Sequence, residues 1–109
     1  MINARLRRLV QVIQEKKGEN LIILDVRKLT WIADYFIILT GTSLIHTRTL
    51  AESILEKLKG TPCLVEGMES GSWIILDYHD IVVHIFLPET RDYYRLEKLW
   101  GDAKEVPLE

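Results

Sequence analysis

Hydrophobic residues at the start of the chain recur at intervals of three and four positions. This spacing predicts an amphipathic helix with one buried face. The apolar positions of that face are Ile2, Leu6, Leu9, Val10 and Ile13. The following Lys16-Lys17-Gly18 predicts the end of the helix, since cations and glycine favour helix C-termini.

Two short apolar runs follow and predict strands. Leu21 to Val26 is almost continuously apolar, which is typical of a buried strand, and Tyr35 to Leu39 is a second, aromatic-rich run. Thr40-Gly41-Thr42-Ser43 then closes the second strand and opens a helix, because Thr and Ser cap helices and glycine permits a sharp turn. Helical spacing continues until Lys59-Gly60. The apolar positions of this second helix are Leu50, Ala51, Ile54, Leu55 and Leu58.

The rest of the chain predicts three more strands and a last helix. Pro62 to Glu66 is a short strand, Gly67 to Ser72 a loop, and Trp73 to Leu87 a two-stranded hairpin. Pro88 begins the last helix, since proline favours the first helical position. This helix carries Tyr93, Leu96 and Trp100 on one side and is followed by Gly101.

The order of these elements predicts the fold class. A strand–helix–strand connection through the middle helix implies some parallel pairing, whereas the hairpin is antiparallel. We therefore predict a single α/β domain over residues 1–109. It is a compact sandwich of helices on a mixed sheet of about five strands.

The hairpin is interrupted by the polar segment Asp77-Tyr78-His79-Asp80, which predicts a tight turn at Tyr78-His79. Pairing outward from this turn defines a register. It sets Asp77 opposite Asp80, Ile75 opposite Val82, and Trp73 opposite His84.

The two faces of the hairpin differ in chemistry, because side chains alternate across a strand. The aliphatic face reads as core and carries Ile74, Leu76, Ile81, Val83, Ile85 and Leu87. The other face carries Trp73, Ile75, Asp77, Asp80, Val82, His84 and Phe86. Large aromatics beside carboxylates are typical of a protein-docking surface. The alternative is that a helix of the same chain covers this second face.

Composition narrows the function classes. Hydrophobic residues make up 48% and charged residues 28% of the chain, as in ordinary globular proteins. The formal net charge of −2 disfavours direct nucleic-acid binding as the main activity, because phosphate binding usually needs a basic excess. The first residues lack the apolar run of a secretory signal, and the single Cys63 fits a reducing cytoplasm. An inert, buried thiol is the plainer reading of Cys63.

The turn from Thr40 to Ser43 is the most enzyme-like feature. Free amides and hydroxyls at a helix N-terminus can hold an anion, and nucleotidyltransferases hold a nucleotide phosphate in such a turn. That chemistry also needs closely spaced carboxylates for two metal ions. The next acidic residues, Glu52 and Glu56, form no Asp-x-Asp pair. A small nucleotide-binding or nucleotidyl-transferring enzyme is therefore the alternative, and capping is the plainer role of the turn.

Other candidate chemistry is weaker. The three histidines, His46, His79 and His84, lie at no metal-ligand spacing with one another or with Cys63, so we expect no metal and no cofactor. Asp77 and Asp80 flank a turn, where Asp often caps local amides. We therefore expect a surface without reaction chemistry rather than a catalytic site.

Taken together, the motifs resemble those of the ribosomal silencing factor family, also called Iojap-like proteins. The resemblance runs from about residue 20 to Ala103. The matching segments are LIILDV at 21–26, IADYFIILTGTS at 32–43, Val65-Glu66-Gly67, WIILDYHDIVVHIF at 73–86, Leu87-Pro88-Glu89, Arg91, Tyr94 and LEKLW at 96–100.

The resemblance implies a non-enzymatic translation repressor. Members bind the large ribosomal subunit through ribosomal protein L-fourteen, on the face where the small subunit docks, and so keep the subunits apart. Organelle relatives assist large-subunit assembly. The resemblance also implies a fold like a reduced nucleotidyltransferase without its catalytic carboxylates, and a homodimer in the free state.

Carried over by position, Trp73 is the foremost candidate for ribosomal contact. Its neighbours on the same hairpin face, Ile75, Asp77, Asp80, Val82 and His84, are further candidates. Tyr94 and Trp100 also match the family, and a helix packing on the sheet explains them equally well. Asp34 and Tyr35 match too, and a structural role in the turn before the second strand is their plainer account. One departure is His79, which stands where the family usually has a turn glycine, so a positive φ there would be costlier.

Overall fold

A computed structural model gives the fold of the chain and describes residues 4–108. Its helices are α1 (Ala4–Glu15), α2 (Leu44–Lys57), α3 (Pro88–Tyr94) and α4 (Leu96–Leu99). Its strands are β1 (Glu19–Asp25), β2 (Tyr35–Thr40), β3 (Leu64–Glu66), β4 (Trp73–Asp77), β5 (Ile81–Phe86) and β6 (Lys104–Glu105). The α/β class is confirmed.

The strands form one mixed sheet in the order β3-β4-β5-β2-β1-β6. The parallel pair is β2 with β5, in which Tyr35 lies opposite Ile81 and Thr40 opposite Phe86. The other neighbouring strands are antiparallel. The sheet therefore contains the predicted parallel pairing and the predicted hairpin. It has six strands rather than five, because the two-residue β6 adds an edge that hydrophobic spacing cannot reveal.

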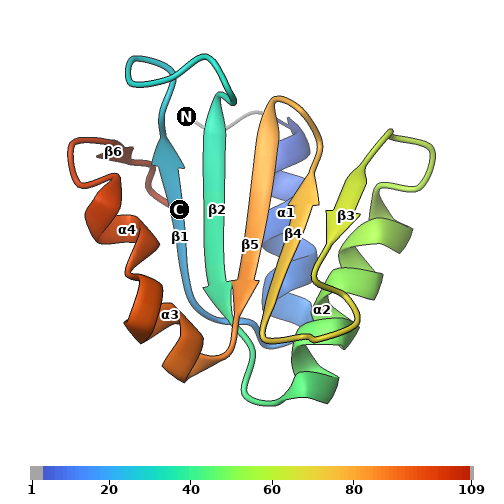
Figure 1. Cartoon of the computed structure of the whole chain (residues 1–109). Coiled ribbons are helices and arrows are strands. Elements are labelled where there is room, and N and C mark those ends of the chain that lie inside the picture. Colours follow the sequence, from blue (N-terminus) through green and yellow to red (C-terminus); the bar gives the residue numbers. More distant parts are fainter. Residues whose placement is uncertain (1–3, 109) are drawn as a thin grey trace.

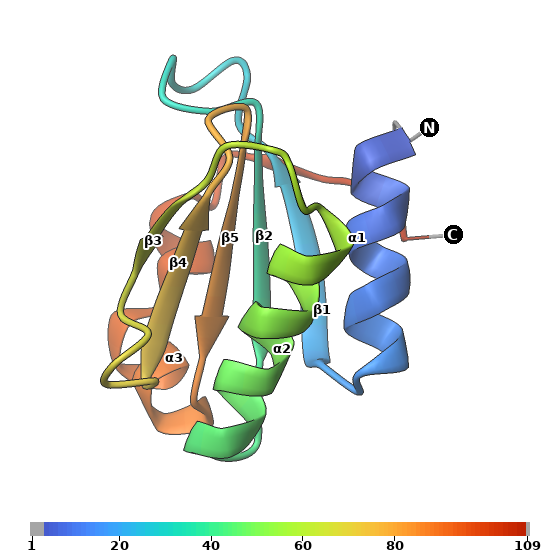
Figure 2. The same ribbon diagram turned by 90° about the vertical axis from the view of Figure 1, so that its right-hand side faces the viewer.

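Helices cover the two faces of the sheet unequally (Figures 1 and 2). The long helices α1 and α2 lie side by side on one face and bury the main core. The short α3 and α4 lie on the opposite face, mostly beside β1, β2 and β5 (Figure 1). The edge strand β3 lies away from them, and β4 meets α3 through Trp73 at its first residue. Part of that second face is therefore left without a helix.

The start of α1 agrees with the predicted helix, whose positions Leu6, Leu9 and Ile13 are fully buried. The predicted apolar position Ile2 lies outside the described residues. None of the helices within residues 4–108 is long and apolar enough to cross a membrane.

The hairpin faces were predicted correctly, but the register was wrong. Asp77 lies opposite Val82, Ile75 opposite His84, and Trp73 opposite Phe86. The turn is longer than predicted and takes in Tyr78, His79 and Asp80. Because the error is an even number of residues, each strand residue stays on its predicted face.

Asp80 is the exception, since the longer turn takes it off the strand. Its carboxylate accepts two hydrogen bonds from Arg5 of α1, at 2.6 and 2.9 Å. The placement of Asp80 on the Trp73 face was therefore wrong, because its side chain reaches the helix that packs on the opposite face. His79 has a φ of 80°, so the turn does use the left-handed conformation that favours glycine.

The last helix was predicted as one element and is two. Arg95, with φ 49° and ψ 53°, ends α3 and precedes α4. A residue in the left-handed conformation redirects the chain, so that Leu96 and Trp100 pack on the sheet. Helical spacing alone does not distinguish this break from a continuous helix.

Candidate functional site

The site forms where the second face of the sheet emerges from beneath α3. Trp73 begins β4 there and is partly buried. Its ring stacks on Phe86 with centroids 5.0 Å apart and contacts Tyr94 of α3 at 4.8 Å. Tyr94 itself is 52% exposed. Trp73 is therefore supported from below and from one side while part of its ring remains accessible.

A hydrogen bond fixes the orientation of the indole. Trp73 Nε1 donates to His84 Nδ1 over 3.2 Å. The imidazole must accept at Nδ1, which leaves the proton of the neutral ring on Nε2. Burial lowers the pKa of His84 to about 4, against an opposing effect of the Asp77 charge. His84 is thus a neutral acceptor that holds Trp73 in place.

The loop before β4 also positions Trp73. Arg48 of α2 donates to the Met68 and Glu69 carbonyls at 3.1 and 2.7 Å, and so ties this loop to the helix. Gly67 has a φ of 82°, and a Cβ at this position would collide with the Trp73 carbonyl oxygen. A glycine is therefore required for the loop to pass this close to the strand.

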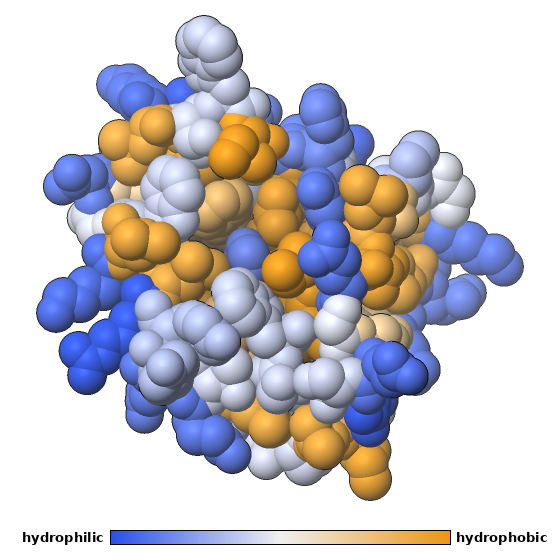
Figure 3. Space-filling model, in the orientation of Figure 1, coloured by the Kyte–Doolittle hydropathy of each residue, from blue (hydrophilic) through white to orange (hydrophobic). Residues whose placement is uncertain are grey.

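Beyond Trp73 the same sheet face is open. Ile75 is partly buried on β4, and Leu64 of the edge strand β3 is 71% exposed. Leu64 pairs with Asp77, so it shares the face of Ile75 and Asp77. We define the docking face by its accessible hydrophobic residues, Leu64, Trp73, Ile75 and Tyr94. Hydrophobic surface gathers over these middle and edge strands in Figure 3.

The predicted site residues divide into two groups. Trp73, Ile75 and Asp77 lie together at the accessible part of the face. Val82 and His84 share that face but are only 6% and 7% exposed, so they support it from within. Asp77 caps the turn by accepting from His79 N at 2.8 Å, as expected for Asp beside a turn.

The second hairpin face is therefore partly accessible, as a docking surface would be, and partly covered by helices of the same chain. Packing with α4 accounts for Trp100, whose ring meets Phe36 edge-to-face at 5.1 Å. Packing also accounts for Tyr35, which lies beneath the Arg27 guanidinium at 5.3 Å. Among the described helices, α3 reaches Trp73 through Tyr94 at its end, so Trp73 and Ile75 stay partly accessible.

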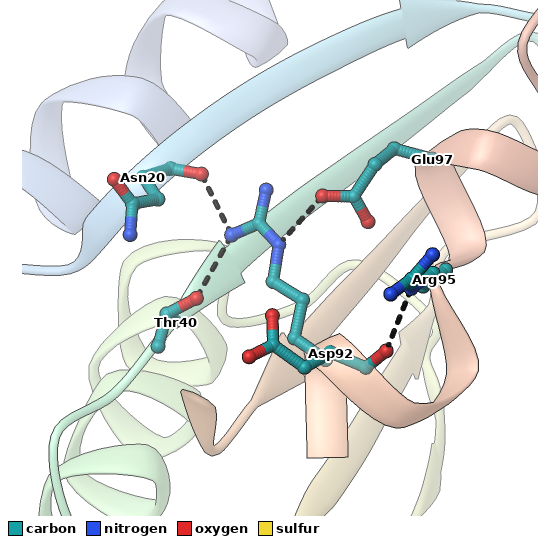
Figure 4. Close-up of polar contacts among 6 residues, drawn as sticks. Asn20, Thr40, Asp92, Arg95 and Glu97 are labelled. Carbon is teal, nitrogen blue, oxygen red and sulfur yellow. Dashed lines mark hydrogen bonds and ion pairs between the residues drawn. The ribbon is translucent and has the colours of Figure 1, made fainter. Parts of the chain in front are cut away.

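Arg91 is a residue whose role the sequence did not reveal. Its side chain is 10% exposed and joins three segments. Nε donates to Glu97 at 2.9 Å, and Nη1 donates to Thr40 Oγ1 at 2.8 Å and to the Asn20 carbonyl at 2.7 Å (Figure 4). This Arg91 clamp ties α3 and α4 to β1 and β2, beside an open groove of about 620 Å³. It therefore holds the two short helices over the part of the sheet face that β1 and β2 form.

Internal contacts engage three amides in and just after the turn from Thr40 to Ser43. Ser43 Oγ accepts from His46 N at 3.1 Å, which confirms the predicted cap. The Thr42 amide donates to His46 Nδ1 at 2.9 Å, and the Gly41 amide to the Phe86 carbonyl at 2.9 Å. These amides serve capping and chain reversal and are not free to hold a phosphate.

Further candidate chemistry is sparse within residues 4–108. That part of the chain contains no group of three or more His, Cys, Asp or Glu side chains arranged to hold a metal ion. Cys63 is partly buried, and burial raises the pKa of its thiol. A thiol with a raised pKa is a poor nucleophile.

The exposure of Leu64 was also missed. The sequence placed it in a short strand, but nothing in its apolar neighbourhood indicated that the strand lies at the sheet edge. Its exposure follows from the strand order, which depends on pairings between distant segments.

Comparison with known proteins identifies the family. The family model described as ribosomal silencing factor during starvation matches residues 1–109. A ribosomal silencing factor from Chromobacterium violaceum is 41% identical over 98 residues, which cover 87% of this chain and 80% of the relative. A crystal structure of a protein from the same organism has a TM-score of 0.87 and 39% identity, and covers 93% of this chain and 87% of that one.

An organelle relative matches as well. The mouse protein named mitochondrial assembly of ribosomal large subunit protein 1 is 31% identical over 98 residues. These residues cover 84% of this chain and 43% of the mouse protein. The family match, the identities and the shared fold agree, and the chain therefore belongs to the ribosomal silencing factor family.

Proposed function

We propose that this protein binds the large ribosomal subunit through ribosomal protein L-fourteen and sterically blocks the small subunit, repressing translation. The observation that carries the proposal is the docking face, with Trp73 at its centre. Aromatic side chains that are rigidly held yet partly accessible are the usual anchors of protein interfaces. The family and the names of its relatives support the ribosome as the partner that Trp73 binds.

The composition of the docking face favours a protein partner over RNA. Leu64, Ile75 and Trp73 are uncharged, and the charged residues beside them, Asp77 and Glu66, are acidic. Carboxylates repel the phosphates of RNA, whereas an acidic rim suits a protein surface that carries Lys or Arg. We therefore expect little direct nucleic-acid contact at this face.

Blocking the small subunit requires a folded body of sufficient size rather than a catalytic reaction. The domain measures 34 × 33 × 26 Å along its principal axes. A body of this size on the joining face of the large subunit would occupy the space that the small subunit needs. The proposed role requires no catalysis and no cofactor, in agreement with the internally bonded amides of Thr42 and Gly41.

The proposal places the protein in the cytoplasm, with the ribosomes on which it acts. In the free state we propose a homodimer, as the family resemblance implies.

The test is sedimentation of the protein with purified large subunits, small subunits and both together. We expect co-migration with the large subunit and fewer joined particles. Because the interface is centred on protein, binding should fall only modestly as salt is raised. Binding to neither subunit would contradict the proposal.

The nucleotide-binding alternative has a separate test. Calorimetry with ATP, GTP or CTP plus magnesium is expected to give no binding heat, because Gly41, Thr42 and His46 already use their amides internally. Saturable heat that is lost in Ser43→Ala would favour the enzyme reading instead.

A further inference from the structure

The loop between β1 and β2 presents an unusual group of exposed hydrophobic residues. Trp31 is 101% exposed, Ile32 68% and Leu29 44%. No described side chain covers the indole of Trp31. Large apolar side chains grouped in this way commonly mark an interaction site.

The backbone of this loop is held in place. Leu29 N and Thr30 N both donate to the Val26 carbonyl, at 3.0 and 3.1 Å. Ile32 N donates to Thr30 Oγ1 at 3.1 Å. The exposed tip is therefore a fixed projection, and its ordering costs less on binding than that of a free loop.

The base of the loop joins the structure behind the docking face. Ala33 is 5% exposed and packs in the same hydrophobic cluster as Val82, with Ile75 and Trp73 against it. Asp34 N donates to the Asp80 carbonyl in the hairpin turn at 2.7 Å. The tip is thus built on the cluster that supports the docking face.

The tip and the docking face also lie on one side of the molecule. In Figure 2 the loop rises above the sheet and leans to the side on which α3 lies. In Figure 3 the surface at the top of the view is pale, and orange patches lie below it and over the middle strands, with pale and blue residues between them. One flat or gently curved partner can reach both.

The size of the docking face supports a larger interface. A stable protein interface takes roughly 800 Å² from each partner. Four side chains, two of them partly buried, provide well short of that area. The loop tip supplies further apolar surface at the Asp77 end of β4, the end opposite to Trp73.

The chemistry of the tip identifies its occupant as protein. Leu29, Trp31 and Ile32 carry no charge, and the nearby Arg27 is paired with Asp25 at 2.7 Å, which leaves Lys28 as the exposed cation beside the tip. RNA binding usually takes several phosphate contacts from cations, whereas aliphatic and aromatic side chains together fill protein pockets.

We infer that Trp31 and Ile32 form a second anchor of the ribosome-binding surface and bury against the same large-subunit protein that Trp73 contacts. This inference rests on the proposed function. It adds a contact point that was not among the candidate residues of the hairpin.

The test compares large-subunit affinities of Trp31→Ser, Ile32→Ser and the unchanged protein. Ile45→Ser is the matched control, because Ile45 is 76% exposed but lies on α2, which covers the other face of the sheet (Figure 2). We expect at least tenfold weaker binding for Trp31→Ser, a smaller loss for Ile32→Ser, and no change for Ile45→Ser. Both loop variants should fold, since neither side chain is buried.

A photo-reactive phenylalanine analogue at position 31 identifies the occupant. Cross-linking to a large-subunit protein supports the inference. Cross-linking to ribosomal RNA or to a second copy of the chain overturns it, as does unchanged affinity of Trp31→Ser. If the unchanged protein binds no large subunit, the proposed function fails first, and the two failures are thereby distinguished.

Discussion

His84 makes the anchor sensitive to acid, although it lies almost entirely inside the protein. Its pKa is about 4 in the folded state because burial disfavours the charged ring. The unfolded chain, with an ordinary histidine pKa near 6.5, binds more protons between these two values. Stability is therefore full above about pH 6.5 and falls as the pH is lowered towards 4.

We predict that the protonation of His84 on unfolding makes the free energy of unfolding about 2 kcal/mol lower at pH 5 than at pH 7. Urea denaturation at both pH values measures this loss. The matched variant is His84→Gln, whose side-chain oxygen can accept from Trp73 and does not titrate. An equal pH dependence in the variant and the unchanged protein would show that His84 is not the group responsible.

His79 illustrates a local cost at the hairpin turn. A φ of 80° is unfavourable for a side chain with a Cβ, whereas glycine adopts it readily. We predict that His79→Gly raises the free energy of unfolding by about 0.5–1 kcal/mol, and that His79→Val lowers it. A shift of the urea midpoint at constant slope measures both effects. A less stable His79→Gly protein would mean that contacts of the imidazole outweigh the backbone strain.

Among the elements, α3 and α4 depend on the Arg91 clamp. Removing the guanidinium breaks three hydrogen bonds and leaves the Glu97 carboxylate, which is partly buried, without its cation. We predict that Arg91→Met lowers the free energy of unfolding by about 2–3 kcal/mol. Adding Glu97→Leu should recover part of the loss, because it removes the unpaired charge.

Hydrogen exchange of the α3 and α4 amides measures whether the helix pair loosens. The control is Arg95→Met, since Arg95 is exposed and its Nε donates only to the Asp92 carbonyl at 3.2 Å. Equal exchange in Arg91→Met and Arg95→Met would contradict the clamp.

The helices and strands themselves were largely predictable, because their signals are local. The Ser43 cap, the buried positions of α1 and the parallel pair followed from spacing and capping chemistry. The hairpin faces survived a wrong register because side chains alternate every second residue, so an even shift preserves them. The break at Arg95 was missed, since a single left-handed residue leaves helical spacing nearly unchanged.

Across the whole molecule, the docking face was only half predictable. The alternation of β4 identified Trp73 and Ile75. The exposure of Leu64 and Trp31, the turning of Asp80 towards Arg5 and the reach of Arg91 to Asn20 all depend on contacts between distant segments. Hydrophobic spacing records which side chains share a face, but it does not record which part of that face a helix covers.

The whole-molecule account rests on Trp73 as the anchor of ribosome binding. The most direct measurement is the affinity for purified large subunits of Trp73→Ala, with Trp73→Phe beside it to retain ring contact with Phe86 and Tyr94. Truncating an interface anchor costs on the order of 2 kcal/mol or more, so Trp73→Ala should remain folded and bind at least tenfold more weakly. The affinity of Trp73→Phe for large subunits should lie between those of Trp73→Ala and the unchanged protein. A folded Trp73→Ala protein that co-sediments with large subunits as the unchanged protein does would contradict the account.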